Sequence, residues 1–517
     1  MFLFLSLASS QGLGSSSVQG AFGAVTIDGK IWNQVALRPI IPIGKVSVAL
    51  DIVFYIDQNG NIHDDEWDFS DGKKSKNSII DKIYYIRYGK KWDPFYFQVG
   101  ALDNVTLGKG ILVNRYTNTI LYPQVRKVGM DIKFKVSGFN FYGFTNDFKE
   151  NLGLTGFRVS KNIINGINIG GSLVADRNQY LGLRDSDNDG RPDLVDDFPD
   201  DPLYWLDTDG DGIADVDPNE LDIDGDGVTD TLDSNIPGWD LDSIYVLDTD
   251  IMRKPEPLNV QNRKRSIYAV SLDASKTILA ESNMSVSIYA QFASLIGKTV
   301  DPISAEEVSL GNGFIPFGLS TKLGPARFKF EYRMMPSGKF EFGYWDRSYE
   351  IERATFSSSF MNDNSGLRTG EIITKDSRLG KFGKQKGYFS TLSIDLGEMV
   401  GASMSYQNLF GEQWNENENN FNNDRNQSFI AGISLKKPIS KITNARWYYQ
   451  QRNVPNPFDF EFTESTISGY RVGIKLGNGM ILNYIFRQSF RDIDGDGKVN
   501  GKDETINMTS IETSFSF

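Results

Sequence analysis

Apolar and polar side chains alternate with a period of two along most of this 517-residue chain, and this pattern restricts the fold more than any other feature. The segment 327–334 has apolar side chains at every even position and charged ones at every odd position: Phe328, Phe330, Tyr332 and Met334 against Arg327, Lys329, Glu331 and Arg333. The segments 128–136, 283–294 and 470–476 alternate in the same way. Because successive side chains of a strand point to opposite faces, the pattern predicts β-strands with one apolar and one wet face.

Such strands can pair their apolar faces in a soluble β-sandwich or turn them toward lipid in a membrane barrel. The connections favour the barrel, because tight turns at 42–45, 136–138, 322–325 and 475–478 alternate with long polar loops at 57–78, 178–262, 411–425 and 453–465. Outer-membrane barrels have short periplasmic turns and long external loops. The apolar faces also carry the aromatic side chains that interfacial girdles require. These are Phe328, Phe330, Tyr332, Trp447, Tyr449, Tyr470, Tyr484 and Phe486.

The final segment, INMTSIETSFSF, alternates and closes on Phe517. It resembles the assembly signal of Gram-negative outer-membrane β-barrels, and the whole pattern is similar to that of porins. The resemblance implies insertion into the outer membrane of a Gram-negative bacterium by the barrel assembly machinery. Closure of the sheet also gives partners to the edge N–H and C=O groups that hydrocarbon cannot satisfy. A soluble calcium-binding β protein is the alternative.

We therefore predict an all-β fold, a large antiparallel transmembrane β-barrel of roughly 18–22 strands with a calcium-binding loop insert. Residues 1–10 are interpreted as the remnant of a signal peptide, with a buried first strand as the alternative. Residues 11–182 are expected to form the first part of the barrel, 183–250 an external insert, and 251–517 the second part. About nine strands precede the insert and about twelve or thirteen follow it, and the segment 350–386 is the hardest to divide.

The insert is strongly acidic. From Asp185 to Asp250 the chain has 23 acidic residues and one basic residue, Arg191, which gives a local net charge of −22. Since the whole chain carries −13, the remainder carries +9. Without counter-ions such a segment would repel itself and stay disordered.

A repeated pattern, D-x-D-x-D-G-x-x-D-x-x-D, accounts for much of this acidity. It begins at Asp185 and again at Asp222, and a middle copy begins at Asp207. In the middle copy Pro218 stands where the last carboxylate should be, so Asp217 or Glu220 is the substitute. A fourth copy lies in the loop at 490–504. The candidate metal ligands are Asp185, Asp187, Asp189, Asp193, Asp196, Asp207, Asp209, Asp211, Asp215, Asp222, Asp224, Asp226, Asp230, Asp233, Asp492, Asp494, Asp496, Asn500 and Asp503.

Calcium is the metal that this pattern favours. Ca²⁺ takes six to eight oxygen ligands at about 2.3–2.6 Å, whereas Mg²⁺ demands octahedral geometry and keeps its waters. The insert resembles the thrombospondin type 3 repeats of bacterial surface proteins, and the fourth copy resembles an EF-hand or dockerin-type loop. The resemblance implies Ca²⁺ as the cofactor. A plain disordered acidic loop is the alternative.

Catalytic motifs are weak. The chain has no Cys and one His, His63, in the stretch NIHDDEWD. A thiolate site and a Cys nucleophile are excluded, and we interpret His63 as a solvated loop residue. The stretch LGKGI at 107–111 is too short for a phosphate cradle. We therefore expect that the chain is not an enzyme.

Two features bear on transport. The long amphipathic segment 102–125 is either an external loop or a segment that folds inward and narrows the pore. The predicted wet faces carry more basic than acidic residues: Arg327, Lys329, Arg333, Arg471, Lys475, Lys133 and Lys135 against Glu331 and Asp131. Fixed positive charge along a pore favours anionic solutes, unless these charges pair across strands.

Two functions fit these observations. The first is a porin-like channel or transporter with calcium-stabilised extracellular loops, whose partners are outer-membrane lipid and small solutes in the lumen. The second is a barrel-anchored structural or adhesive protein whose repeats engage a surface or matrix protein. No feature of the sequence indicates binding of nucleic acid.

Overall fold

The computed structural model describes residues 17–516, apart from 28–29, 64–66, 124, 231–250, 361–367, 416–417, 478, 493–497 and 502–503. The proposed signal peptide remnant at 1–10 lies outside the described residues. The helical elements are short: α2 (Gly72–Ile80), α3 (Tyr349–Glu352) and the 3-10 helices η2 (Ile164–Gly166) and η4 (Ser377–Lys381). Within the described ranges, no helix is long and apolar enough to cross a membrane.

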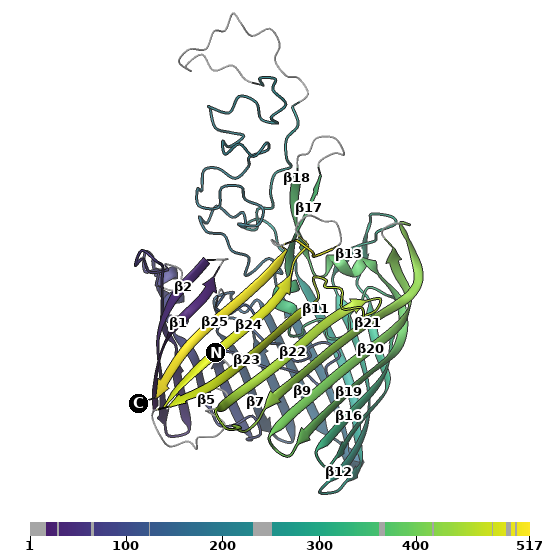
Figure 1. The fold of residues 1–517 in the computed structure, drawn as a ribbon. Coiled ribbons are helices and arrows are strands. Elements are labelled where there is room, and N and C mark those ends of the chain that lie inside the picture. The colour runs from purple at the N-terminus through teal and green to yellow at the C-terminus, as the bar shows by residue number, and fades with distance from the viewer. Residues whose placement is uncertain are drawn as a thin grey trace, which may run out of the picture.

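A single antiparallel sheet of 21 strands closes on itself, because β1 pairs with both β2 and β25 (Figure 1). Two of its strands, β3 and β4, lie end to end beside β2, so the sheet has 20 strand positions. The strands before the insert are β1 (Ser17–Ile27), β2 (Lys30–Ile43), β3 (Val46–Leu50), β4 (Ile52–Ile56), β5 (Ile83–Tyr88), β6 (Phe95–Gly100), β7 (Gly129–Val136), β8 (Phe139–Thr145), β9 (Leu154–Asn162) and β10 (Ile167–Asp176). Those after it are β11 (Ile267–Ala280), β12 (Met284–Ile296), β15 (Asn312–Leu323), β16 (Ala326–Met335), β19 (Phe382–Leu396), β20 (Val400–Asn415), β21 (Asn420–Leu435), β22 (Ile442–Val454), β23 (Ile467–Gly477), β24 (Met480–Phe490) and β25 (Thr505–Ser516).

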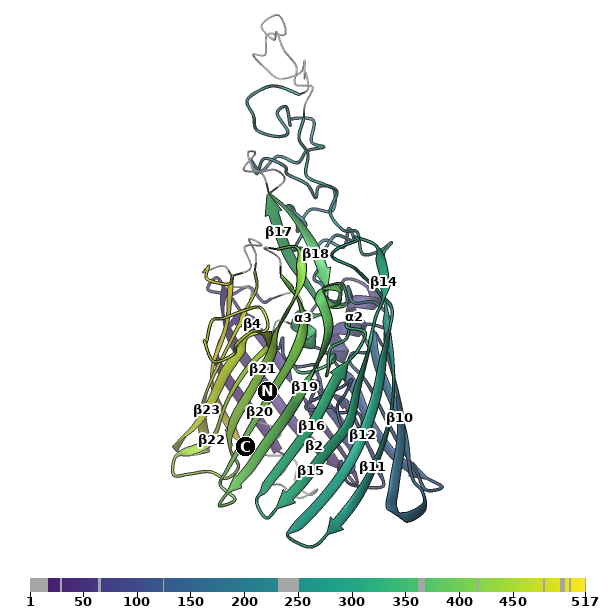
Figure 2. The ribbon, with the colours of Figure 1, turned by 90° about the vertical axis from the view of Figure 1, so that its right-hand side faces the viewer.

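Long and short connections lie at opposite ends of the barrel (Figures 1 and 2). At one end, the short-turn rim, strands are joined by connections such as 44–45, 137–138 and 324–325. At the other end, the long-loop rim, the connections include 57–82, 101–128, 177–266 and 336–381. The start of β1 and the end of β25 both lie at the short-turn rim, because Gln19 pairs with Ser516 there. This closed, asymmetric barrel confirms the predicted fold class and strand range.

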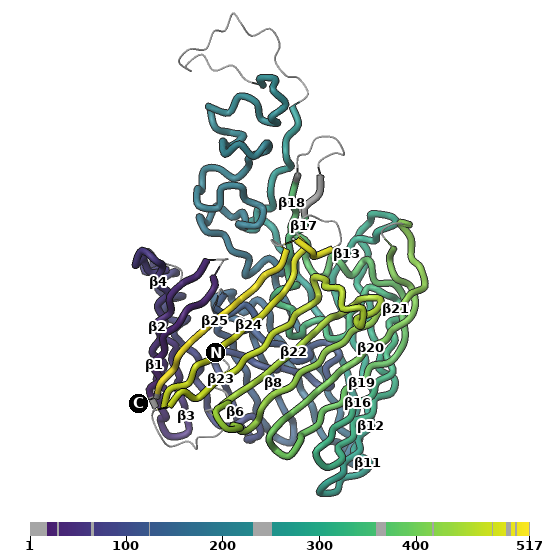
Figure 3. Tube along the Cα trace, in the orientation of Figure 1, coloured from purple at the N-terminus to yellow at the C-terminus, as the bar shows by residue number. Residues whose placement is uncertain are grey.

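The strand count after the insert is wrong, although the count before it is confirmed. Nine strand positions precede the insert and eleven follow it, not twelve or thirteen. Four strands after the insert lie outside the barrel wall, in two hairpins: β13 (Lys298–Val300) with β14 (Glu307–Ser309), and β17 (Ala354–Phe360) with β18 (Arg368–Thr374). The β17–β18 hairpin rises from the long-loop rim beside the insert, as the Cα trace shows (Figure 3). It occupies the segment that the sequence could not divide.

The outward side chains of the barrel wall are apolar. Phe22, Val35, Leu173, Leu272 and Ile433 come from five different strands and are 49–64% exposed. Water opposes so large an apolar surface, whereas hydrocarbon does not. Closed antiparallel barrels with an apolar outer band are outer-membrane structures. The fold therefore confirms the predicted location.

Candidate functional site

Two long connections fold into the barrel. The segments 101–123 and 336–353, here called the lumen plug, are joined by backbone hydrogen bonds from Asn114 N to Trp345 O (3.0 Å) and from Trp345 N to Leu112 O (3.1 Å). The plug reaches the wall, where the Lys329 side chain of β16 donates to the carbonyl of Lys109 (2.8 Å). Of the two interpretations of 102–125, the inward fold that narrows the pore is correct.

Apolar side chains hold the lumen plug against one part of the wall. Trp345 and Tyr116 of the plug are fully buried and belong to one cluster with Leu154 of β9, Ile267 of β11 and Ile315 of β15. Part of the lumen is thus a packed hydrophobic core. A polar lumen face does not predict such a core, which forms only because the plug supplies the apolar partners.

Buried ion pairs also fix the plug. Arg452 of β22 pairs with Asp346 and with Glu341 of the plug (both 2.6 Å). On another side, Arg353 of the plug pairs with Glu150 (2.9 Å). Removing one partner of a buried ion pair costs about 3–5 kcal/mol, because the other charge is left uncompensated. These pairs therefore hold the plug in one place.

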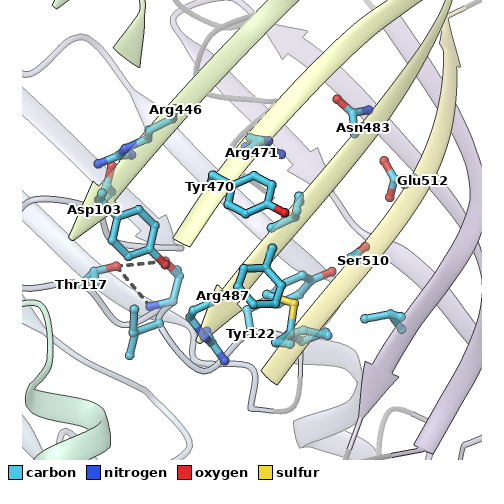
Figure 4. A pocket seen from close by; sticks show the side chains of 18 of the residues that line it. Asp103, Thr117, Tyr122, Arg446, Tyr470, Arg471, Asn483, Arg487, Ser510 and Glu512 are labelled. Carbon is cyan, nitrogen blue, oxygen red and sulfur yellow. Dashed lines mark hydrogen bonds between the residues drawn. The ribbon is translucent and has the colours of Figure 1, made fainter. Parts of the chain in front are cut away.

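Beside the plug, a lumen cavity of about 610 Å³ remains. A narrower cavity of about 100 Å³ shares four of its lining residues: Asp103, Arg347, Arg446 and Tyr448. Seven arginines line one or both cavities, and one of them, Arg38, is paired with Asp51 and Glu512. Arg327 lines the wider cavity only, and the other five are Arg115, Arg347, Arg446, Arg471 and Arg487. We call these five residues the lumen arginine cluster, and Figure 4 shows three of them, Arg446, Arg471 and Arg487.

The cluster comes from the plug and from three adjacent strands. Arg446 of β22 is directly opposite Arg471 of β23, and Arg487 lies on the next strand, β24. Arg115 of the plug interacts electrostatically with Arg347 and Arg446. Like charges held this close in a partly desolvated space repel one another, and an anion between them would relieve the repulsion.

Few carboxylates offset these charges. Asp103 lines both cavities, whereas Glu512 already pairs with Arg38 (2.7 Å). Asp346 and Asp395 line the wider cavity but pair with Arg452 and Lys436, respectively. The described lining of the cavities is therefore net positive.

The basic residues predicted on the lumen face have three different environments: some are ion-paired or packed on a ring, some are exposed, and some line the cavities. Lys329 and Arg333 both pair with Glu331 (2.6 Å each), so pairing is the right interpretation for them. Asp131 pairs with Lys91 (3.4 Å), and Lys133 lies over the ring of Tyr142 (4.4 Å). Lys135 and Lys475 are exposed near the short-turn rim. Arg327 lines the wider cavity and Arg471 belongs to the arginine cluster.

Sequence reasoning missed four members of the cluster. Arg446 and Arg487 lie in alternating strands, where the side-chain period alone would have placed them on the lumen face. Arg115 and Arg347 lie in plug segments without a period of two. For these two residues the sequence offered no signal.

The three acidic repeats of the insert share one backbone arrangement. The Gly N–H of each repeat donates to its first Asp: Gly190 to Asp185 (3.0 Å), Gly212 to Asp207 (2.9 Å) and Gly227 to Asp222 (2.8 Å). The N–H of the second residue donates to the ninth: Ser186 to Asp193 (2.8 Å), Thr208 to Asp215 (2.7 Å) and Ile223 to Asp230 (2.8 Å). The three glycines have φ values of 97°, 92° and 89°, which explains why the sixth position is Gly.

Three carboxylates converge in each repeat. One oxygen from each member of a trio lies within 4.8 Å of the others in Asp185, Asp187 and Asp189, in Asp207, Asp209 and Asp211, and in Asp222, Asp224 and Asp226. Among the described residues, Asp185 Oδ1, Asp187 Oδ2 and Asp222 Oδ1 are buried without a hydrogen-bond partner. Buried oxygens are rarely left without a partner. An all-oxygen set of this kind fits a hard cation such as Ca²⁺.

The carboxylate at the last position of the pattern interacts electrostatically with the trio. Burial, with a smaller contribution from the charges of Asp189 and Asp187, raises the pKa of Asp196 to about 6. In the middle repeat burial raises the pKa of Glu220, and Asp211 and Asp209 raise it further. Asp217 instead accepts hydrogen bonds from the backbone N–H and the side chain of Asn219 (both 2.8 Å). Of the two substitutes for Pro218, Glu220 is the one that interacts electrostatically with the trio, and its role as a ligand stays a prediction.

Some predicted ligands lie outside the described residues: Asp233, Asp494, Asp496 and Asp503. Asp492 and Asn500 are described, but residues 493–497 and 502–503 of their loop are not, so the fourth copy stays a prediction. His63 packs edge-on against Trp32, with ring centroids 4.7 Å apart.

No family model and no curated protein matches the chain. Solved structures of Pseudomonas aeruginosa proteins are similar at low identity. OccK10 (OpdN) is 7% identical, with 98% of this chain and 99% of that chain covered and a TM-score of 0.35. The outer membrane protein OprD is 7% identical, with 97% and 94% covered and a TM-score of 0.33. Similarity at this level assigns the chain to no family.

Proposed function

We propose that the chain is an outer-membrane channel for small anionic solutes, and that its external insert binds Ca²⁺. The observation that carries the channel is the lumen arginine cluster. The five guanidinium groups of this cluster line cavities beside the plug, and few carboxylates face them. Fixed positive charge in a confined, partly desolvated passage lowers the entry barrier for anions and raises it for cations.

The geometry also suggests which anions pass. The guanidinium fork donates two parallel hydrogen bonds to a carboxylate or phosphate, so Arg suits such groups better than Lys does. The plug limits the free space to a cavity of about 610 Å³, which suits small solutes. Small carboxylates or phosphates are therefore the proposed class of solute.

The proposal for the insert is supported by the three converging carboxylate trios and by their buried oxygens without partners. Long loops of outer-membrane barrels face the outside. The insert belongs to the long-loop rim, so its sites would meet extracellular Ca²⁺. A bound ion would neutralise each trio and stabilise the mouth of the channel.

Reversal potentials in planar bilayers under a salt gradient test the channel. The purified wild-type protein is expected to prefer Cl⁻ over K⁺. The triple variant Arg446→Gln, Arg471→Gln, Arg487→Gln should lose most of this preference. A matched control replaces three exposed lysines near the short-turn rim, Lys45→Gln, Lys161→Gln and Lys276→Gln, and should keep it. Cation selectivity of the wild type would end the proposal.

A second candidate, a barrel that serves only as an anchor for the insert, is favoured by one observation. The lumen plug is packed and ion-paired to the wall, as expected of a barrel that does not conduct. Liposome swelling separates the two functions. Swelling in small carboxylates supports the channel, whereas proteoliposomes that swell in no solute support the anchor.

A further inference from the structure

A row of basic side chains crosses the outside of the barrel near the long-loop rim. Lys386 of β19, Phe410 of β20 and Arg425 of β21 are direct neighbours in the strand register. Lys384 lies two residues from Lys386, toward the long-loop rim. All four side chains are exposed.

Below this row the same face is aromatic and then aliphatic. Tyr388 is paired in register with Tyr332, and Tyr406 with Phe429. One row further down, Leu392 and Met404 are 42% and 48% exposed. The order of charged, aromatic and aliphatic rows matches the order of headgroup, interface and hydrocarbon in a leaflet.

The spacing places the basic row at the headgroup level. From Lys386 to Leu396, which is 53% exposed at the short-turn rim, the strand advances ten residues. A membrane-spanning β-strand needs about 9–11 residues. The basic row therefore sits at the opposite surface of the bilayer from Leu396, which is the outer leaflet.

The loop 455–466 borders this face. Phe458 packs on Tyr406 and Phe429, with ring centroids 5.7 and 5.2 Å apart, and remains 47% exposed. The side chain of Gln451, on the outward face of β22, donates to the carbonyl of Glu461 in the loop (2.6 Å). Gln427 of β21 likewise donates to the carbonyl of Pro455. These bonds fix the loop against the outer wall.

The basic side chains of the row are available to a ligand. In the part of the chain that the structure describes, no ion pair joins Lys384, Lys386 or Arg425 to a carboxylate. Two carboxylates close by in the chain or the register are held by backbone N–H groups instead. Glu412 Oε2 accepts from Lys384 N (3.1 Å), and Asp424 Oδ1 accepts from Arg425 N (2.7 Å).

We propose that this face binds a phosphate-bearing lipid of the outer leaflet. Lys384, Lys386 and Arg425 contact the phosphate, and the acyl chains lie on the aliphatic row beneath. Phe410 and Phe458 border the headgroup. Clusters of Lys and Arg at a membrane surface attract anionic headgroups, and their long apolar stems suit the interface. This site is on the outside of the barrel, so it does not depend on whether the lumen conducts.

Native mass spectrometry of the full chain tests the proposal. The protein is titrated in neutral detergent micelles with a diphosphorylated glycolipid, and in parallel with the same lipid after removal of its phosphates. One diphosphorylated lipid is expected to stay bound per barrel. The triple variant Lys384→Gln, Lys386→Gln, Arg425→Gln should lower the affinity by roughly 10- to 100-fold, since each basic residue near a membrane surface contributes a few-fold.

The short-turn control Lys45→Gln, Lys161→Gln, Lys276→Gln makes the same change of charge and should bind as the wild type does. All six side chains are exposed, so both variants should fold, and heat-modifiable migration on gels verifies this. Two results would overturn the proposal: equal retention by the triple variant and the wild type, or equal binding of the phosphorylated and dephosphorylated lipids. Displacement of the lipid by millimolar inorganic phosphate would also contradict it, because it would assign the site to the free anion.

Discussion

The insert from Asp185 to Asp230 lies in the chain between two strands of the barrel wall, β10 and β11. The wall and the insert satisfy their polar groups differently. In the wall, the ladder between β10 and β11 runs through ten consecutive residue pairs, and Arg158 and Asp273 form an ion pair across the lumen face. In the insert, carboxylates accept hydrogen bonds mainly from N–H groups two to seven residues away. Longer-range bonds run from Asp207 N to Asp197 and from Met252 N to Asp224 (both 2.9 Å). It buries few apolar side chains, Ala214 and Ile223 among them.

The difference shows what each region requires from its surroundings. The wall is complete once its edges pair and its exterior meets hydrocarbon. The insert has local turns and carboxylate trios that repel, and we propose that a counter-ion stabilises its structure. The lumen plug belongs with the wall in this respect, because a hydrophobic core and buried ion pairs hold it.

The largest effect is expected when the plug loses an ion pair. Arg452→Ala leaves Asp346 buried without an ion-pair partner and Glu341 with Lys375 alone, and it should reduce the free energy of unfolding by about 3–5 kcal/mol. Lys437→Ala removes a solvent-exposed pair with Glu398 (2.6 Å) and should leave the free energy of unfolding nearly unchanged. Urea unfolding in detergent measures both. A loss below 1 kcal/mol for Arg452→Ala would show that the pair does not hold the plug.

Two variants of the middle repeat test whether Glu220, and not the neighbouring Asp217, is a ligand. Glu220→Gln should weaken Ca²⁺ binding to that repeat by roughly 10- to 100-fold, because a charged oxygen ligand is lost. Asp217→Asn serves as the control and should leave the affinity within about twofold of the wild type, since Asp217 bonds Asn219 instead. Isothermal titration calorimetry with Ca²⁺ distinguishes them. Equal affinities for the two variants would remove Glu220 from the site.

The pH dependence of the insert has a definite sign. Burial raises the pKa of Asp185 and that of Asp196, the latter to about 6. Because the pKa values are raised in the folded state, protonation stabilises the ion-free folded insert. This stabilisation is complete below about pH 4, the pKa of Asp in an unfolded chain, and is lost as the pH rises through about 6. Because Ca²⁺ must displace these protons, its affinity should fall below pH 6.

Calorimetry in buffers of different ionisation enthalpy measures the protons released on binding. More protons should be released per Ca²⁺ at pH 5.5 than at pH 7.5. Equal release at both values would contradict the protonated trios.

The smallest effect concerns one turn. Gly212→Ala places a Cβ at φ 92° with no atom within 4 Å, so the cost is backbone strain alone, about 1–2 kcal/mol, confined to the middle repeat. Gly72→Ala, at the start of α2 and also with no atom within 4 Å, is the control and should cost nothing. Hydrogen exchange should show faster opening of 207–215 in the first variant only. Unchanged exchange there would mean that the turn is not strained.

The sequence predicted the wall better than the lumen. The alternation in 327–334 correctly separates outward Phe328 and Tyr332 from inward Glu331 and Arg333, because one face of a strand meets lipid and the other water. It also predicts the three repeats of the insert, whose spacing is local. It does not predict the plug contact between Leu112 and Trp345, which lie 233 residues apart and follow no strand period. The sequence also does not predict that β17 and β18 lie outside the wall, because the alternation of a strand does not reveal which sheet it joins.

Hydrogen exchange of the full chain in detergent, with Ca²⁺ and after chelation by EDTA, tests most directly whether the insert and the wall are stabilised by different means. On chelation, amides of 185–230 should lose protection, whereas those of β10 and β11 should keep theirs. Ca²⁺ at a hundred times its Kd contributes about 2.7 kcal/mol per site, so the loss in the insert should approach 100-fold. Equal protection of the insert with and without Ca²⁺ would contradict the account.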